Sequence, residues 1–171
     1  MESLLEQAID QELIEDGVIA HTNADIEWFW KLREDVSPLV AQCKYLQAFD
    51  ISLPIPQIGI VISKIINELQ DQEGVEHIFP FGHLADGNIH FLIGKKEDTV
   101  ELKNRINDIV YSPLQACGGS VSAEHGIGHD KKAYLGISRN RIEVELMRSI
   151  KKNIDPKNIL NRGKIFDLTS D

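Results

Sequence analysis

Two short polar segments hold the residue types that could do chemistry. The first runs from His83 to His90, with a histidine at each end, and the second, residues 122–128, contains Glu124 and His125 among small residues. Imidazole nitrogens and carboxylate oxygens bind divalent transition metals, and histidine is the side chain most often used as a general base. Glycines beside Glu124 and His125 suit a backbone that approaches a ligand closely. These segments therefore suggest a metal site, and a solvent-exposed polar pair of histidines is the alternative interpretation.

The Asp86-Gly87 dipeptide predicts how the first segment folds. Asp-Gly between two strand-like stretches favours a two-residue type I′ turn. With these residues as the turn, His83 lies directly opposite His90 on the same face of a hairpin. Such pairs have Cβ atoms about 4.5 to 5.5 Å apart, which allows two imidazoles to share one metal ion. Glu124 would complete a two-histidine, one-carboxylate site with coordination positions left for substrate.

The elements around these segments predict an α+β fold. Strand-like alternation of apolar and polar residues occurs around residues 49–54, 75–81 and 88–93. Apolar residues recur at helical spacing around residues 4–13, 24–33, 56–69, 98–110 and 138–150. We expect an antiparallel sheet with helices packed on one face, built from ferredoxin-like elements, in a single domain over residues 1–171.

Composition excludes several classes of protein. The net charge of −9 argues against nucleic acid as a partner of the whole chain. Residues 131–164 nevertheless carry ten basic and three acidic residues, which could complement an anionic ligand. Cys43 and Cys117 form no CxxC pattern, so a disulfide framework and a zinc ribbon are excluded. Without a recognisable secretory signal or membrane-spanning stretch, the chain is expected to be cytoplasmic.

The ordered motifs resemble a known family, the C-terminal domain of FAD-linked oxidases. These flavoproteins oxidise D-2-hydroxy acids such as D-lactate, glycolate and D-2-hydroxyglutarate. The resemblance covers roughly residues 30–166. It is carried by five motifs, which are Leu32-Arg33-Glu34, Phe49-Asp50-Ile51-Ser52-Leu53-Pro54, the segment from His83 to His90, the segment from Gly119 to Gly128, and Asp155-Pro156-Lys157-Asn158-Ile159-Leu160-Asn161.

This resemblance implies a role for each matching position. It implies that a divalent metal, zinc or manganese, is held by His83, His90 and Glu124. His125 matches the general base of the family and also a position that contacts substrate. Arg33 and Ser37 match substrate-binding positions, and a guanidinium is a natural partner for a carboxylate. Asn161 matches a residue that approaches FAD.

The resemblance also implies partners and leaves alternatives open. The expected partners are a small anionic 2-hydroxy acid, a separate FAD-binding subunit or an electron acceptor, and a second copy of the chain in a homo-oligomer. We expect the FAD-binding domain to be absent, so that the isolated chain is inactive. Ala48 and Leu92 stand where the family often has a lysine and a polar residue that contact substrate. A non-catalytic relic or metal-binding module, and a flavin-free metal-dependent hydrolase, are the alternatives.

Overall fold

The computed structural model describes residues 1–168, and the chain divides into two compact units. The first unit, Met1–Leu39, contains two helices whose start and end the sequence predicted closely. The second of them begins at a capping box, in which Thr22 Oγ accepts from the backbone N–H of Asp25 and the Asp25 carboxylate accepts from that of Thr22. The helices of this part of the chain are α1 (Glu2–Asp10), α2 (Asn23–Glu34) and, across the boundary between the units, α3 (Ser37–Val40).

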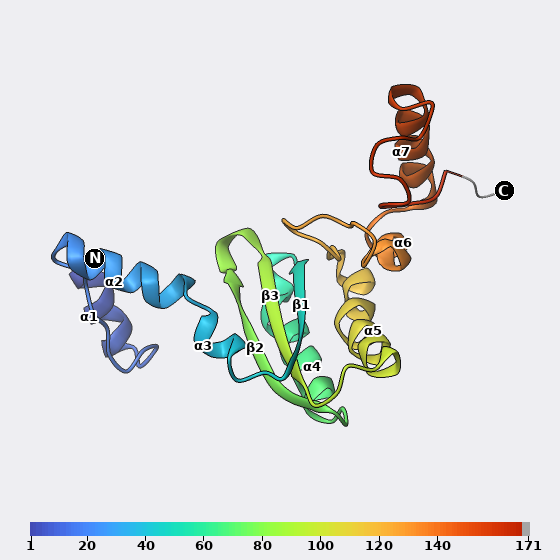
Figure 1. Cartoon of the computed structure of the whole chain (residues 1–171). Coiled ribbons are helices and arrows are strands. Elements are labelled where there is room, and N and C mark those ends of the chain that lie inside the picture. The colour runs from blue at the N-terminus through green and yellow to red at the C-terminus, as the bar shows by residue number, and fades with distance from the viewer. Residues whose placement is uncertain (169–171) are drawn as a thin grey trace. The chain divides into compact units, whose positions relative to one another are not determined.

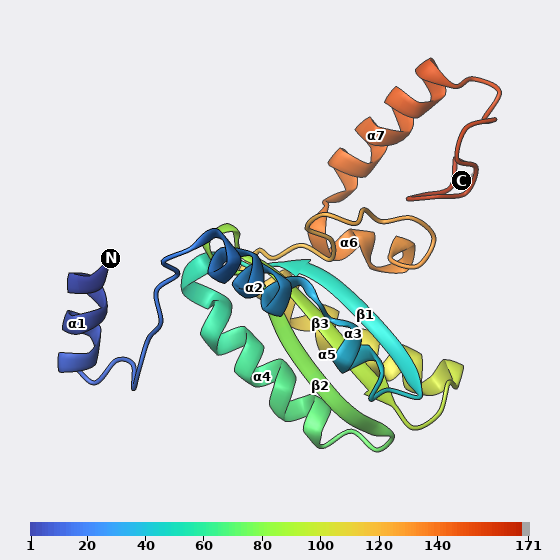
Figure 2. The ribbon, with the colours of Figure 1, turned by 60° about the vertical axis from the view of Figure 1, so that its left-hand side comes forward.

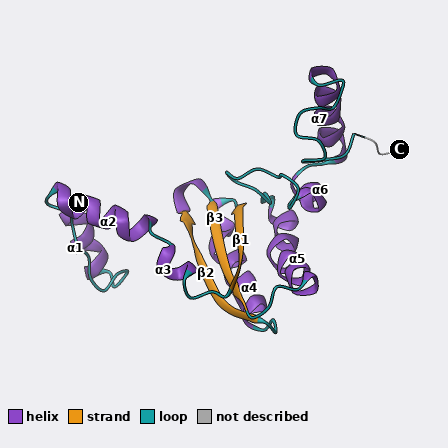
Figure 3. Ribbon diagram, viewed as in Figure 1, coloured by secondary structure: helices purple, strands orange, loops and turns teal. Residues whose placement is uncertain are grey.

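A three-stranded antiparallel sheet forms the centre of the second unit, and its strand order is β1-β3-β2. Figure 3 shows β3 between the other two strands. Successive side chains point to opposite faces of a strand, so that one face can be apolar and the other polar. The strands are β1 (Tyr45–Ser52), β2 (Val75–His83) and β3 (Asn88–Lys95).

Helices α4 (Ile58–Gln70) and α5 (Val100–Cys117) pack on one face of this sheet (Figure 1). Figure 2 shows α4 beside β2. Apolar side chains from both helices and from the inner face of the strands form one core, whose fully buried members include Ile51, Ile65, Phe91, Ile93, Ile106 and Leu114. The predicted α+β fold, an antiparallel sheet with helices on one face, is confirmed.

The connection between β2 and β3 differs from the predicted two-residue turn. Leu84–Asp86 forms one 3₁₀ turn, and Gly87 follows in the left-handed conformation with a φ of +70°. The connection is therefore longer than predicted, and His83 pairs with Asn88. The prediction that His83 lies directly opposite His90 is wrong, because the extra residues of the turn shift the register of the two strands.

Gly87 is required at its position for two reasons. An L-residue is strained at this positive φ, and a Cβ atom there would lie 2.2 Å from the carbonyl oxygen of Leu53. The backbone N–H of Leu53 also donates to the carbonyl oxygen of Gly87, at 2.8 Å. The turn is thus fixed against the chain that leaves β1.

The chain after α5 returns to β1. Ser52 and Ser120 form an antiparallel bridge, with N–H···O distances of 3.0 and 2.9 Å in the two directions. This bridge places the loop of residues 121–131 beside the strand that carries Asp50. The remaining helical elements are η1 (Ile55–Gln57), which precedes α4, and η3 (Lys132–Tyr134), α6 (Leu135–Ser138) and α7 (Arg141–Ile154). Within residues 1–168, no helix has the length and apolar character needed to cross a membrane.

Candidate active site

The face of the sheet opposite the helices carries both histidines of the first segment. On β3, His90 alternates with the core residues Ile89 and Phe91, and its backbone partner on β1 is Asp50. His83, at the end of β2, is displaced along the sheet from His90 by two residues. The two imidazoles still meet, with ring centroids 5.7 Å apart and planes at 82°. The diagonal arrangement therefore keeps the proximity that the direct pairing was expected to provide.

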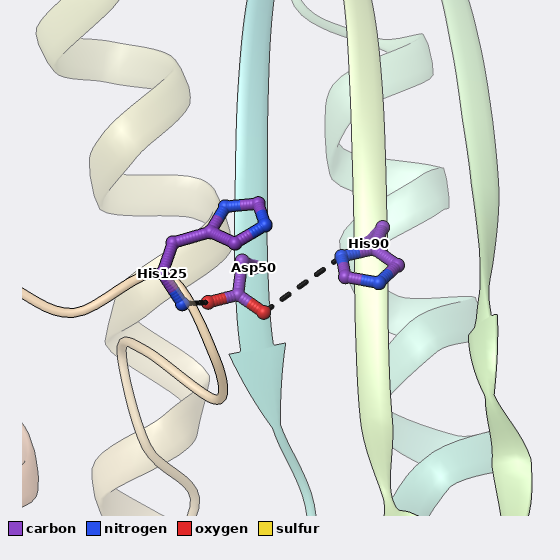
Figure 4. A group of neighbouring side chains, drawn as sticks. All are labelled: Asp50, His90 and His125. Carbon is purple, nitrogen blue, oxygen red and sulfur yellow. Dashed lines mark hydrogen bonds and ion pairs between the residues drawn. The ribbon is translucent and has the colours of Figure 1, made fainter. Parts of the chain in front are cut away.

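The loop after α5 brings the second segment to the same place. The Asp50 carboxylate is fully buried, and its Oδ2 accepts from the backbone N–H groups of Ala123, Glu124 and His125 at 3.1, 3.0 and 2.8 Å. Figure 4 shows the contact from His125 and the approach of Asp50 to His90. Consecutive N–H groups that converge on one oxygen fix the backbone from which the side chains of Glu124 and His125 project.

One nitrogen or oxygen atom from each of His83, His90 and Glu124 lies within 4.8 Å of the others. His83 Nε2 is 4.0 Å from Glu124 Oε1, and both of these side chains are open to solvent. Two imidazoles and one carboxylate are a donor set that suits zinc, and contraction by about 1 to 2 Å would bring them to bonding distance of one ion. The structure thus brings together the predicted ligand set, and metal binding itself stays a prediction.

Burial of His90 favours its neutral form. Its side chain is 14% exposed, and burial lowers the pKa of His90 although Asp50 opposes this effect. A neutral imidazole keeps a lone pair for a metal ion. Burial raises the pKa of Asp50, but the N–H groups of His125 and Glu124 and the charge of Lys131 outweigh it, so that the pKa is lowered. The carboxylate is therefore ionised at neutral pH.

His125 lies between the histidine cluster and a cavity. Its ring stacks on that of His90, with centroids 5.8 Å apart and planes at 19°. Its side chain also lines a cavity of about 540 Å³, together with Ala48, Lys103 and Lys131. An exposed imidazole at the mouth of a cavity, beside a metal-ligand set, is suitably placed to exchange a proton with a bound molecule.

Ala48 and Leu92, the two departures noted in the sequence, are backbone partners on neighbouring strands. They lie two residues from Asp50 and His90 respectively and therefore on the same face of the sheet. This pair offers no polar side-chain atom to a substrate.

Arg33 lies near the end of α2, and Ser37 lies three residues after that helix ends. The Arg33 guanidinium is 3.7 Å from the Glu34 carboxylate and stacks over the Trp30 ring at 5.2 Å. Ser37 begins α3, and its backbone N–H donates to Asp35 Oδ1. Both side chains are exposed, and their predicted contact with substrate stays a prediction.

Asn161 lies in the loop that follows α7, at a φ of +45°. Its Oδ1 accepts from Lys164 Nζ at 3.1 Å. Together with Lys151, Asn158 and Phe166, it lines a cavity of about 410 Å³. The local structure is a polar pocket on the basic part of the chain, and the proposed approach of Asn161 to FAD stays a prediction.

Sequence reasoning missed the residues that assemble this site. Asp50 belonged to a recognised motif without a role, and Lys131 was read only as part of the basic segment. Lys131 Nζ donates to the Asp50 carbonyl oxygen and to Ser122 Oγ, and it is 3.5 Å from Asp50 Oδ2. The available signal was the alternation in β1, because a charged residue between Phe49 and Ile51 must face away from the core and needs partners there.

Several curated proteins that resemble this chain are named D-2-hydroxyglutarate dehydrogenase. The rat protein is 33% identical over 162 residues, which cover 95% of this chain and 30% of the relative. The Arabidopsis thaliana protein is 35% identical over 166 residues, covering 97% of this chain and 29% of the relative. The protein from Xanthomonas citri pv. viticola is 34% identical over 167 residues, covering 95% and 35%. The chain thus spans about a third of the length of these relatives.

The names of these relatives bear on the expected location of the chain. The rat and Arabidopsis proteins are named as mitochondrial, whereas the Xanthomonas protein carries no location in its name. The expected cytoplasmic location of this chain therefore stays a prediction.

A profile of the family described as FAD linked oxidases, C-terminal domain, matches residues 1–165. The match includes every motif on which the resemblance was based. It also includes the helices of the first unit and the sheet of the second. The chain therefore belongs to the FAD-linked oxidases, and it corresponds to their C-terminal domain.

Proposed function

We propose that this chain is the metal- and substrate-binding part of an FAD-dependent dehydrogenase that oxidises a D-2-hydroxy acid to a 2-oxo acid. The observation that carries the proposal is the meeting of His83, His90 and Glu124 within 4.8 Å, with His125 stacked on His90. Membership of the FAD-linked oxidases and the names of the relatives support it.

Oxidation of a 2-hydroxy acid removes the hydroxyl proton and the hydrogen on the α carbon with its two bonding electrons. In the proposed reaction His125 accepts the hydroxyl proton, because it lies beside the ligand set and faces the cavity. His83, His90 and Glu124 would hold zinc or manganese. When bound, the metal ion supplies a Lewis acid for the hydroxyl oxygen, and FAD accepts the hydrogen and its electron pair.

The substrate carboxylate is proposed to bind Arg33 and Ser37, and Asn161 to approach FAD. A guanidinium can bind a carboxylate through two parallel hydrogen bonds. FAD itself would be held mainly by a domain outside these 171 residues, because the chain spans about 30% of the length of its relatives.

Metal analysis tests the ligand set. Purified protein is expected to bind about one zinc or manganese ion per chain, and His83→Ala should abolish stoichiometric binding. The matched control is His77→Ala, which alters a histidine on the same strand that stacks on Phe79. Metal content that is the same in the wild type and in both variants would refute the assignment.

Dye reduction by the FAD-loaded protein that contains this chain tests the reaction. D-2-hydroxyglutarate, D-lactate and glycolate are the substrates to compare. His125→Asn should lower kcat by about 10²- to 10⁴-fold, as loss of a general base does, with metal still bound. His129→Asn, four residues away, serves as the control. Absence of dye reduction with all D-2-hydroxy acids would refute the proposed activity.

A further inference from the structure

The two oxygens of the Asp50 carboxylate have very different surroundings. Oδ2 accepts three backbone N–H groups and lies 3.1 Å from Ser122 Oγ. Oδ1 is also buried, but within the described part of the chain it has no hydrogen-bond partner. Burying a carboxylate oxygen without a hydrogen-bond donor costs free energy, so we expect a neighbouring group to donate a hydrogen bond to Oδ1.

His90 is the group that faces Oδ1. The two residues are direct backbone partners on β1 and β3, and His90 Nδ1 lies 3.7 Å from Oδ1. This separation exceeds a hydrogen bond by about 0.7 Å, which a small rotation of the imidazole removes. A proton on Nδ1 would then be donated to Oδ1, and the lone pair of the neutral ring would be on Nε2.

We propose that Asp50 is a positioning residue that acts on both halves of the site. Through Oδ1 it orients His90 and selects the tautomer whose Nε2 can bind a metal ion. Through Oδ2 it fixes the backbone of residues 123–125, from which Glu124 and His125 project. This inference rests on the metal site proposed above and assigns the residue that makes the site rigid.

The distances also permit a different set of ligands, in which Asp50, His90 and His125 hold the ion. Two observations favour the positioning role. Asp50 is fully buried, whereas the Glu124 side chain is 56% exposed and can exchange ligands with solvent. Lys131 Nζ lies 3.5 Å from the same carboxylate and would repel a divalent ion there.

The first test needs no substitution. Long-range ¹H–¹⁵N correlation spectra of the metal-free protein identify which nitrogen of each neutral histidine carries the proton. The His90 signals can be assigned by their loss in His90→Gln. We expect His90 to be protonated on Nδ1, and protonation on Nε2 would overturn the proposal. This result is independent of metal binding, so a protein that binds no metal would refute the proposed function without deciding the role of Asp50.

The second test measures zinc affinity by competition with a chromophoric chelator. Asp50→Asn keeps the shape of the side chain. When the amide oxygen accepts the backbone N–H groups of residues 123–125, the amide NH₂ group faces His90. We expect His90 to change to the Nε2–H tautomer and zinc to bind about 10- to 100-fold more weakly, as for other residues that support a metal ligand. Ser122→Ala removes the contacts of Ser122 Oγ with Asp50 Oδ2, the Gly126 carbonyl and Lys131 Nζ. It leaves Oδ1 and the three backbone N–H bonds to Oδ2 in place, and it should change zinc affinity by less than threefold.

X-ray absorption of the zinc-loaded proteins separates the positioning role from direct ligation. In the positioning role, Asp50→Asn retains two imidazoles and one carboxylate oxygen around zinc, and Glu124→Gln loses the carboxylate. The opposite pattern would overturn the proposal, as would unchanged zinc affinity in Asp50→Asn. If this variant does not fold, as judged from its amide spectrum, the wild-type tautomer and the ligand set of Glu124→Gln still decide between the two roles.

Discussion

The turn at Gly87 offers the sharpest test of how the fold positions the histidines. Gly87→Ala places a side chain at a φ of +70°, and its Cβ would lie 2.2 Å from the Leu53 carbonyl oxygen. The left-handed conformation costs an L-residue about 1 to 2 kcal/mol. The clash must also displace the hydrogen bond from Leu53 N–H to the Gly87 carbonyl, worth about 1 kcal/mol. We therefore expect the free energy of unfolding to fall by about 2 to 3 kcal/mol.

Two other glycines separate the parts of this estimate. Gly118 has a φ of +73° and no atom within 4 Å of an added Cβ, so Gly118→Ala measures the conformational cost alone. Gly59 lies in α4 with the same open surroundings and no positive φ, so Gly59→Ala should stabilise the protein by about 0.5 to 1 kcal/mol. The order of stability should be Gly59→Ala, wild type, Gly118→Ala and Gly87→Ala.

Urea unfolding followed by circular dichroism is the appropriate assay, because both tryptophans, Trp28 and Trp30, lie in the first unit. The midpoint of thermal unfolding should fall by about 4 to 12 °C in Gly87→Ala, at about 2 to 4 °C per kcal/mol. Zinc affinity should fall as well, since the turn sets the offset between the two histidines. If Gly87→Ala is no less stable than Gly118→Ala, the contact with Leu53 does not fix the turn and this reasoning is refuted.

Four further predictions concern stability. Ile65→Ala leaves a cavity at a fully buried core position and should cost about 2 to 5 kcal/mol in urea unfolding, whereas a loss below 1 kcal/mol would contradict the packing described. Thr99→Ala removes the N-cap of α5, whose Oγ accepts from Leu102 N–H at 3.3 Å, and should cost about 1 kcal/mol by the same measurement. Lys151 and the N–H groups of the following loop lower the pKa of Asp155 to about 2. The ionised carboxylate therefore stabilises the fold above its unfolded pKa of about 4, and this stabilisation is lost as the pH falls towards 2. Asp155→Asn should remove this acid dependence from amide hydrogen exchange in α7. Burial raises the pKa of Tyr111, so the unfolded state releases this proton first and stability falls as the pH rises above about 10; Tyr111→Phe should make alkaline unfolding less steep.

Local sequence signals predicted most of the elements of the second unit, because its sheet and core helices have strong apolar patterns. Most strands and helices begin and end within a few residues of the predicted positions, but α5 continues to Cys117, well beyond the predicted end near residue 110. The register of the hairpin was not predictable from Asp86-Gly87 alone. The same dipeptide closes a longer turn when Leu84 and Ala85 join it, and the contact of Gly87 with Leu53, distant in sequence, selects that turn.

Helix α5 shows a second limit of local reasoning. Pro113 lies inside this helix, although proline lacks the N–H that an interior position donates. The helix continues to Cys117 because Leu114, one residue further on, is fully buried in the core. Burial of one more apolar side chain outweighs the lost hydrogen bond, and only the tertiary structure reveals that gain.

The candidate site was partly predictable for a similar reason. His83, His90, Glu124 and His125 stood out by residue type in two short segments, and the structure brings them together. Asp50 did not stand out, because its partners lie 72 to 75 residues further along the chain. Spacing patterns detect residues that a single turn or helix places side by side, and they do not detect contacts that depend on a returning loop.

The bridge between Ser52 and Ser120 has a consequence for solubility as well as for the site. β1 is an outer strand of the sheet, and an outer strand with free N–H and C=O groups can pair with another chain and aggregate. The returning loop occupies part of this edge, through Ser120 on Ser52 and through Ala123 N–H and Lys131 Nζ on the Asp50 carbonyl. Substitutions that detach the loop should therefore expose an unpaired strand edge and at the same time separate Glu124 and His125 from His90, so that loss of function and aggregation would arise together.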